Sequence, residues 1–211
     1  MATLFDQMPS RQALCKIASD FHQRGWMAGT AGNLSTRSNK NSDCFWITTS
    51  GLPKGQLEIS DFIQINTDSG DVVHRFHDQD NPSAESSIHR VIYQLFPETK
   101  ACFHVHSVDA CLATEKISTD QTAMPLPVIE MLKGLDIWEE QPEVALPLFD
   151  NLTDVSAIAE QIRQCFRTTP PDVPALMIRN HGITVWGTSL QQVYNQVEII
   201  EFIMSYLARQ S

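Results

Sequence analysis

Apolar side chains recur every three or four positions in several stretches of the chain, a spacing that predicts amphipathic helices. The expected helices lie at about 10–24, from 82 onwards, shortly after 106, at about 154–166 and from 189 onwards. Ser10 and Ser189 stand where a helix cap is expected, and Gly25 suits the position just after the first helix ends.

Short runs rich in β-branched and aromatic residues predict strands between these helices. The expected strands are about 33–37, about 44–49, 62–66, 72–76, 101–106, about 143–146, 175–179 and 183–186. Strands and helices are mixed without regular alternation, which predicts an α/β fold: a three-layer α/β/α sandwich with a mixed, mainly antiparallel central sheet. We see no repeat or interdomain linker, so we expect a single domain over residues 1–211.

Composition and charge narrow the class of protein. The 211 residues are 42% hydrophobic and carry a formal net charge of −10, without a cluster of Lys and Arg. We therefore do not expect a nucleic-acid partner, which would require a basic face. Five cysteines, an odd number without Cys-x-x-Cys spacing, argue against a disulfide framework. The N-terminus does not resemble a signal peptide and no apolar run approaches ~20 residues, so we expect a cytoplasmic protein without a membrane span.

The pair His104 and His106 is the sharpest chemical signal in the chain. Residues two apart on a strand point to the same face, so both imidazoles can reach one cation at about 2.0–2.1 Å. His181 is the best candidate for a third ligand, because it lies in a tight turn after an expected strand. Three histidine ligands leave one coordination position of zinc open for substrate or water. Taken alone, the pair is equally compatible with two histidines buried in a core.

Two alternatives accompany this metal site. A cupin barrel also uses two histidines at this spacing, followed by a carboxylate that Asp109 would supply, but the expected helices argue against an all-β barrel. Cys102 lies on the same expected strand face as the histidine pair and could be a further ligand. A free cysteine is more often simply buried.

Three short segments carry small residues and hydroxyls that suit an anion: 29–33 (GTAGN), 48–51 (TTSG) and 82–85 (PSAE). Glycine lets backbone N–H groups approach an anion closely, and the first turn of a helix offers free N–H groups to phosphate. Each segment alone is weak, because a glycine-rich turn is more often only a turn. Glu85 alone is better explained as complementing a helix dipole or completing a cap.

The five motifs together are far more specific than any of them separately. In order along the chain they are GTAGN, TTSG, PSAE, HVH and NHG, and this combination resembles the class II aldolase family of zinc enzymes. The resemblance runs from about Gly25 to the last helix. It implies a small phosphorylated sugar as substrate, about one Zn²⁺ per chain, and a homo-oligomer such as a tetramer with sites at subunit borders. Because the chain is acidic, the phosphate must be attracted locally by backbone N–H groups and a metal.

The resemblance also implies roles for individual residues. Three residues match the family's zinc ligands: His104, His106 and His181. Five match its phosphate contacts: Gly32, Asn33, Ser50, Gly51 and Ser83. Glu85 matches the glutamate that sits at the metal and takes part in proton transfer. Ala84 departs from the family pattern, because it replaces the second serine of P-S-S-E and removes one phosphate hydroxyl.

Two further segments, 49–55 (TSGLPKG) and above all 130–134 (EMLKG), are similar to the branch of the family that dehydrates a methylthio-substituted ketose phosphate in methionine salvage. In that branch Glu130 matches the acid/base glutamate; without the resemblance it would be a solvated helix or loop residue. We therefore expect a zinc-dependent hydro-lyase. The alternative is an aldolase that cleaves a ketose phosphate such as fuculose or ribulose 1-phosphate. A metal-free module of the adducin type is disfavoured, because all three histidines and Glu85 are present.

Overall fold

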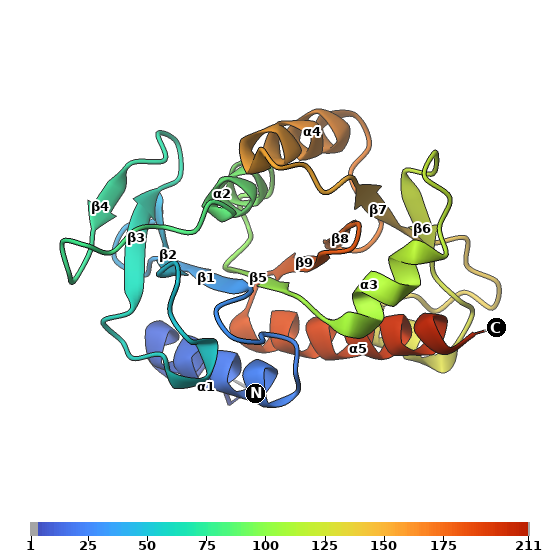
Figure 1. Cartoon of the computed structure of the whole chain (residues 1–211), viewed down its shortest axis with the longest axis horizontal. Coiled ribbons are helices and arrows are strands. Elements are labelled where there is room, and N and C mark those ends of the chain that lie inside the picture. The colour runs from blue at the N-terminus through green and yellow to red at the C-terminus, as the bar shows by residue number, and fades with distance from the viewer. Residues whose placement is uncertain (1–3, 211) are drawn as a thin grey trace.

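A nine-stranded sheet runs through the middle of the computed structural model, which describes residues 4–210 (Figure 1). The strand order is β4-β3-β2-β1-β5-β9-β8-β7-β6. Within the described residues β7 and β8 pair in parallel and the other neighbours pair antiparallel. The mixed, mainly antiparallel sheet is therefore confirmed. The ends of the expected domain, residues 1–3 and 211, lie outside the described range.

The strands follow the expected order along the chain. They are β1 Asn33–Arg37, β2 Cys44–Thr48, β3 Phe62–Asn66, β4 Val72–His74, β5 Ala101–Val105, β6 Ala123–Pro125, β7 Ala145–Phe149, β8 Ala175–Ile178 and β9 Gly182–Gly187. The strand expected near 143–146 begins two residues later, and β6 was not expected. β6 has only three residues and ends at Pro125, so it is too short to show the alternating apolar and polar pattern of a strand.

Helices cover both faces of the sheet. They are α1 Ser10–Gln23, α2 Ser86–Leu95, α3 Val108–Glu115, α4 Val155–Thr168 and α5 Leu190–Arg209, with short 3₁₀ segments η1 Lys54–Gln56 and η2 Glu130–Leu135. Figure 1 shows α2 and α4 on one face and α1 and α5 on the other, which makes three layers. No helix among residues 4–210 combines the length and the apolar character needed to cross a bilayer.

The strand β5 separates two hydrophobic cores. All five of its residues are buried. Phe103 belongs to the core shared with α1 and α5, whereas Cys102 belongs to the core shared with α2 and α4. This alternation follows from the two-residue period of a strand. It places His104 on the same side of the sheet as Cys102.

Two helix starts differ from expectation. Ser10 is the first residue of α1 and does not cap it; Pro9 stands at the cap position without a side-chain hydrogen bond. The second helix begins at Ser86 instead of Pro82. The reason is a contact distant in sequence, because Pro82 forms a β-bridge with Thr49 and that extended pairing prevents a helix from starting there. By contrast, the Ser189 side chain caps α5 as expected, accepting from an N–H in its first turn.

Candidate metal centre

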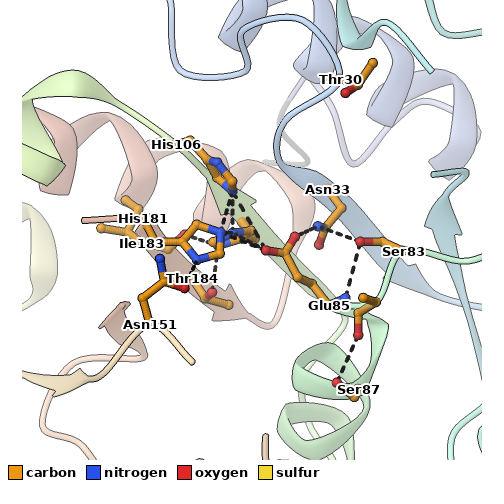
Figure 2. A network of polar contacts seen from close by, with 12 residues as sticks. Thr30, Asn33, Ser83, Glu85, Ser87, His106, Asn151, His181, Ile183 and Thr184 are labelled. Atoms are coloured by element: carbon orange, nitrogen blue, oxygen red, sulfur yellow. Dashed lines mark hydrogen bonds and ion pairs between the residues drawn. The ribbon is translucent and has the colours of Figure 1, made fainter. Parts of the chain in front are cut away.

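Four side chains from three separate parts of the fold converge on one point (Figure 2). Glu85, His104, His106 and His181 each offer a ligand atom, and these atoms all lie within 4.8 Å of one another. His104 and His106 come from the end of β5, and His181 comes from the turn between β8 and β9. Glu85 stands at the N-terminus of α2. The structure therefore brings together the three expected histidines and the expected glutamate.

The pairing of β9 with β5 brings His181 to the other two histidines. His104 is directly opposite Thr184 in this antiparallel pair. Gly182 is required at the start of β9, because a Cβ there would lie 2.0 Å from the Val105 carbonyl oxygen. Beyond the end of β5, the N–H of His106 donates to the Trp26 carbonyl at 2.8 Å, which holds its backbone in line with the strand.

The three imidazoles face one another through the same type of atom. The Nε2 atoms are 2.7 Å apart between His104 and His106, 3.0 Å between His106 and His181, and 3.3 Å between His104 and His181. Ligands about 2.0–2.1 Å from a tetrahedral metal are about 3.3 Å from one another. The Glu85 Oε1 atom completes the group, 2.8 Å from the Nε2 of His181 and 3.2 Å from that of His104.

Hydrogen bonding fixes the tautomer of the most buried histidine. The Nδ1 atom of His104 is 2.9 Å from the Ile183 carbonyl oxygen and 3.0 Å from the Thr184 hydroxyl. A carbonyl can only accept, so Nδ1–H is the donor and the neutral ring presents a lone pair from Nε2 to the cluster. Converging ring nitrogens beside a carboxylate are a donor set that suits a cation.

The electrostatics of Glu85 and His106 agree with this conclusion, whereas the pKa of His104 is raised, because its attraction to Glu85 outweighs its burial. Burial alone would raise the pKa of Glu85, but its attraction to His104 and His181 outweighs burial and holds the pKa well below the usual range. Burial together with the neighbouring imidazoles lowers the pKa of His106 to about 3. An ionised carboxylate and a neutral imidazole are the protonation states that bind metal. The chain thus builds a candidate metal site from residues far apart in sequence.

The expected phosphate contacts gather beside this cluster. The Asn33 side-chain amide donates to the Ser83 hydroxyl at 3.4 Å and also, at short range, to Glu85. The backbone N–H of Ser50 donates to the Asn81 carbonyl at 3.0 Å, so Ser50 and Gly51 lie next to the segment that carries Ser83. Asn33 consequently links the anion segments to the metal cluster.

Gly32 allows this close arrangement. Its φ of +75° lies in the left-handed region, and a Cβ at this position would come within 2.8 Å of the His104 carbonyl oxygen and 2.9 Å of the Met27 methyl carbon. A side chain here would push the loop away from β5. The glycine is therefore needed for the loop to approach the histidines.

Lys54 is a buried residue at this site that sequence reasoning left without a role. It is 2% exposed, and its Nζ donates to the carbonyl oxygens of Thr30 and Leu52, each at 2.9 Å. Its own N–H donates to the Gly29 carbonyl at 3.2 Å. Burial lowers the pKa of Lys54, and the nearby Glu85 partly opposes that shift. One residue thus joins the two glycine-containing loops. The motif 49–55 contained this lysine, but nothing in its pattern predicted burial.

Glu130 is the one expected site residue that this chain does not bring to the cluster. It lies in η2, its side chain is 82% exposed, and its carboxylate pairs with Lys133 at 2.9 Å. It lines a surface cavity with Trp138, and none of the described residues lining that cavity belongs to the metal cluster. Within one chain, the expected acid/base residue is separate from the metal centre.

Cys102 and Asp109, the residues of the two alternative metal assignments, both lie outside the cluster. Cys102 is fully buried among the apolar side chains under α2 and α4, and it is not a member of the cluster. Asp109 lies on α3, where it pairs with Arg209 at 3.2 Å. Neither residue supplies a ligand atom, and the helical layers exclude the cupin barrel.

A cavity of about 430 Å³ opens beside the cluster, and both His106 and His181 line it. The rest of its lining is mostly small or apolar: Gly25, Ala28, Ser107, Val108, Cys111, Leu112, Asn151 and Asn180. In Figure 2, Asn33 and Ser83 lie on one side of the histidines and Asn151 lies on the other. The metal cluster therefore stands between the expected phosphate contacts and this cavity.

Comparison with known proteins adds to this geometry. The family model described as "Class II Aldolase and Adducin N-terminal domain" matches residues 12–207. A methylthioribulose-1-phosphate dehydratase of Microcystis aeruginosa is 49% identical over 197 residues, covering 93% of this chain and 94% of the relative. One of Leptospira biflexa is 38% identical over 207 residues, covering 97% and 99%. The solved structure of L-fuculose-1-phosphate aldolase from Thermus thermophilus shares the fold, with a TM-score of 0.71 at 21% identity, over 95% and 94% of the two chains.

Proposed function

This chain belongs to the class II aldolase and adducin N-terminal domain family, and from that premise we propose that it is a dehydratase of methylthioribulose 1-phosphate in methionine salvage. The names of the similar proteins support the substrate. The observation that carries the chemistry is the convergence of Glu85 with three histidines beside loops suited to phosphate. That arrangement fits an enzyme acting on a phosphorylated sugar through a metal.

We propose zinc as the metal, about one ion per chain, held by His104, His106 and His181. Three neutral imidazoles are a donor set that zinc accepts, and they leave room for a substrate oxygen. A bound zinc ion would supply Lewis-acid polarisation of the substrate's carbonyl group. The Ile183 carbonyl accepts a hydrogen bond from Nδ1 of His104. This bond orients the ring and keeps its Nε2 unprotonated for the metal.

The reaction removes one water from the sugar chain. The proton on C3 and the hydroxyl on C4 leave together as water, and the resulting enol at C3 moves its proton to C4. The product is 5-methylthio-2,3-dioxopentyl phosphate. Glu85, ionised beside the histidines, is proposed to accept or hold a proton near C2 and C3. Glu130 is proposed as the general acid/base that moves the C3 proton or protonates the departing C4 hydroxyl.

The phosphate is proposed to bind at Gly32, Asn33, Ser50, Gly51 and Ser83. Hydroxyl and amide donors at these positions suit an anion, and glycine allows its close approach. Lys54 adds one buried positive charge close to these loops, which matters in a chain whose formal net charge is −10. Local donors of this kind offset the repulsion between an acidic protein and a phosphate.

Glu130 requires a second copy of the chain for this role. We propose a homo-oligomer, a tetramer by resemblance to the family, in which Glu130 of one copy reaches the metal centre of another. The exposed carboxylate and the exposed ring of Trp138 in the same segment support such a contact. We place the protein in the cytoplasm, because its five cysteines are free thiols and a reducing compartment keeps them so.

Product analysis tests the proposal directly. Purified protein of known metal content is incubated with methylthioribulose 1-phosphate. The products are then separated, and their molecular masses are measured by mass spectrometry. Loss of one water with an intact carbon chain supports the dehydratase. Cleavage into two carbon fragments would identify the alternative, an aldolase, which could work with Glu85 and the histidines alone.

A further inference from the structure

The cavity beside His106 and His181 has a chemical character that the metal site does not require. Its side-chain lining includes Val108, Cys111 and Leu112 from α3 and carries no Asp, Glu, Lys or Arg among the described residues. The side-chain oxygens of its two asparagines already have hydrogen-bond partners. The Asn180 side-chain oxygen lies 3.3 Å from the Thr114 hydroxyl, and the Asn151 oxygen lies 3.3 Å from the His181 Nδ1. The lining therefore contains few polar groups that would oppose the binding of an apolar ligand group.

Its position matters as much as its lining. Asn33 and Ser83 lie on one side of the histidines, and Asn151, which lines this cavity, lies on the other (Figure 2). A methylthio-substituted ketose phosphate has the same order along its chain: phosphate on C1, the reacting oxygens on C2 and C3, and the sulfur on C5. A substrate laid across the cluster with its phosphate at Ser83 therefore directs its C5 substituent toward α3.

We propose that this cavity binds the methylthio end of the substrate, and that Val108 and Leu112 determine the preference for a thioether over a hydroxyl at C5. The inference rests on the proposed function for the identity of the substrate. A thioether is apolar and polarisable, so it gains from contact with aliphatic carbon and with the Cys111 sulfur. A C5 hydroxyl would lose hydrogen bonds to water in the same place.

Val108 and Leu112 are the residues to change. They are four positions apart on α3 and therefore lie on the same face of that helix. Val108 is 73% exposed and Leu112 is 43% exposed, so polar substitutions of similar size leave the hydrophobic core unchanged. Val108→Thr and Leu112→Asn remove the apolar surface without opening a cavity in the core.

Binding of unreactive ligands separates this inference from the proposed reaction. Reduction of the C2 carbonyl of methylthioribulose 1-phosphate and of ribulose 1-phosphate gives, after separation from the arabinitol epimers, 5-methylthioribitol 1-phosphate and ribitol 1-phosphate, which cannot undergo the dehydration. Calorimetry of the metal-loaded protein gives the ratio of their dissociation constants. The same ratio is measured for the Val108→Thr/Leu112→Asn double variant. Val73→Thr and Leu4→Asn are matched controls, because both side chains are exposed and neither lines this cavity.

The wild-type protein is expected to bind the methylthio ligand about 10- to 200-fold more tightly than ribitol 1-phosphate. In the double variant the preference should fall to about threefold or less, while ribitol 1-phosphate binding and metal content stay unchanged and both controls keep the wild-type ratio. An unchanged preference in the double variant overturns the inference. If light scattering then shows a smaller oligomer, the face covers a contact with a second copy instead. A wild-type protein that forms no diketone but keeps the binding preference overturns only the proposed reaction.

Discussion

The metal cluster and the segment that carries Glu130 are built in opposite ways. Glu85 and the three histidines are held by a central strand, a helix start and a glycine turn, and they are largely enclosed. Glu130 lies on a six-residue 3₁₀ helix with 82% of its side chain exposed. The first region is complete within one chain. The second presents a reactive group to the surroundings.

This difference indicates how the work of catalysis is divided. A metal site needs ligands fixed within a few tenths of an ångström, which a buried sheet provides. A proton-transfer group that arrives from a second copy is available only in the assembled protein. If Glu130 acts between copies as proposed, we expect the binding of substrate and metal to depend on the single chain and turnover to depend on the assembly.

The largest effect is expected at the cluster. His104→Ala or His106→Ala removes a ligand from a site that has three histidines, so metal content should fall from about one per chain to near zero. Activity should fall to the background of the assay. Metal analysis of the purified variants measures this directly, and thermal unfolding should show a lower Tm because metal stabilises the folded state. If both variants retain full metal, the assignment of the site is wrong.

His181→Ala tests the third ligand separately. Because His181 comes from the turn before β9, its loss leaves the pair on β5 intact. Full metal retention in this variant alone would remove only His181 from the ligand set.

The next effect concerns Glu130. Glu130→Gln keeps the size of the side chain but removes the base, and kcat should fall by about 10²–10⁴-fold. Metal content and KM should change little, because Glu130 is outside the cluster. Activity near that of the wild type, together with cleavage of the sugar into two fragments, would instead point to an aldolase.

Mixing two inactive variants tests whether Glu130 acts between chains. His104→Ala subunits supply an intact Glu130, and Glu130→Gln subunits supply an intact metal site. After unfolding and refolding together in equal amounts, random pairing should restore about a quarter of the active sites. Refolding each variant alone is the control. Absence of recovery in a mixed oligomer would place Glu130 in its own chain's site.

Much of this fold could be predicted because its strands alternate cleanly. Hydrophobic periodicity located most strands to within one or two residues, and the two-residue period placed His104 and His106 on one face. Strand order could not be derived in the same way. One of the two partners of β5 is β9, some eighty residues later in the chain, and no local pattern specifies that pairing. His181 is a candidate from its position in a turn after an expected strand, and the resemblance supports it, but its convergence with the pair does not follow from any local spacing.

The remaining gaps have physical causes as well. Lys54 was overlooked because lysine is almost never fully buried, and only the two carbonyl partners explain its position. The start of α2 was misplaced because a distant β-bridge holds Pro82 extended. The proposed approach of Glu130 to the metal centre of a second copy involves contacts between chains, which the pattern of a single chain does not encode.

A smaller effect is expected at the phosphate contacts. Ser83→Ala or Asn33→Ala removes a donor, and a lost hydrogen bond to a charged group should raise KM for the phosphorylated substrate about tenfold or more. Asn33→Ala should also lower kcat, because its amide holds Glu85. Steady-state kinetics separate the two constants. Unchanged KM in both variants would contradict the placement of the phosphate.

Lys54→Met should give a similar or smaller rise in KM, about three- to tenfold, because the lysine acts through the loops that it joins. Two carbonyls also lose their partner, so the Tm should fall. Lys116→Met is the control: Lys116 also donates to backbone carbonyls, those of Leu207 and Ala208 at 3.0 Å and that of Gln210, but on the surface. Lys54→Arg should recover part of the loss. Equal KM values in the Lys54→Met and Lys116→Met variants would mean that Lys54 stabilises the fold but does not contribute to phosphate binding.

The smallest effect on activity is expected at Glu201, a carboxylic acid on α5 that lines the same cavity as Met131 next to Glu130. It is 2% exposed. Burial raises its pKa to about 7, although the nearby Ser107 hydroxyl opposes part of this shift. Because the folded pKa exceeds the unfolded value of 4.5, the folded protein binds the extra proton. The free energy of unfolding should therefore decrease as pH rises from about 4.5 to 7, by roughly 3 kcal/mol in full.

Glu201→Gln should remove this dependence, because a neutral amide replaces the acid at every pH. Urea unfolding near pH 8 should then find the variant more stable than the wild type by up to about 3 kcal/mol, with little difference near pH 5. Glu198→Gln is the control on the same helix, since Glu198 is partly exposed and pairs with Arg24 at 2.8 Å. Its pH profile should follow the wild type. Both glutamine variants should keep wild-type kcat, since neither side chain belongs to the cluster or to the segment of Glu130. Parallel pH profiles for Glu201→Gln and the wild type would mean that Glu201 is ionised in the folded protein and that water reaches this cavity.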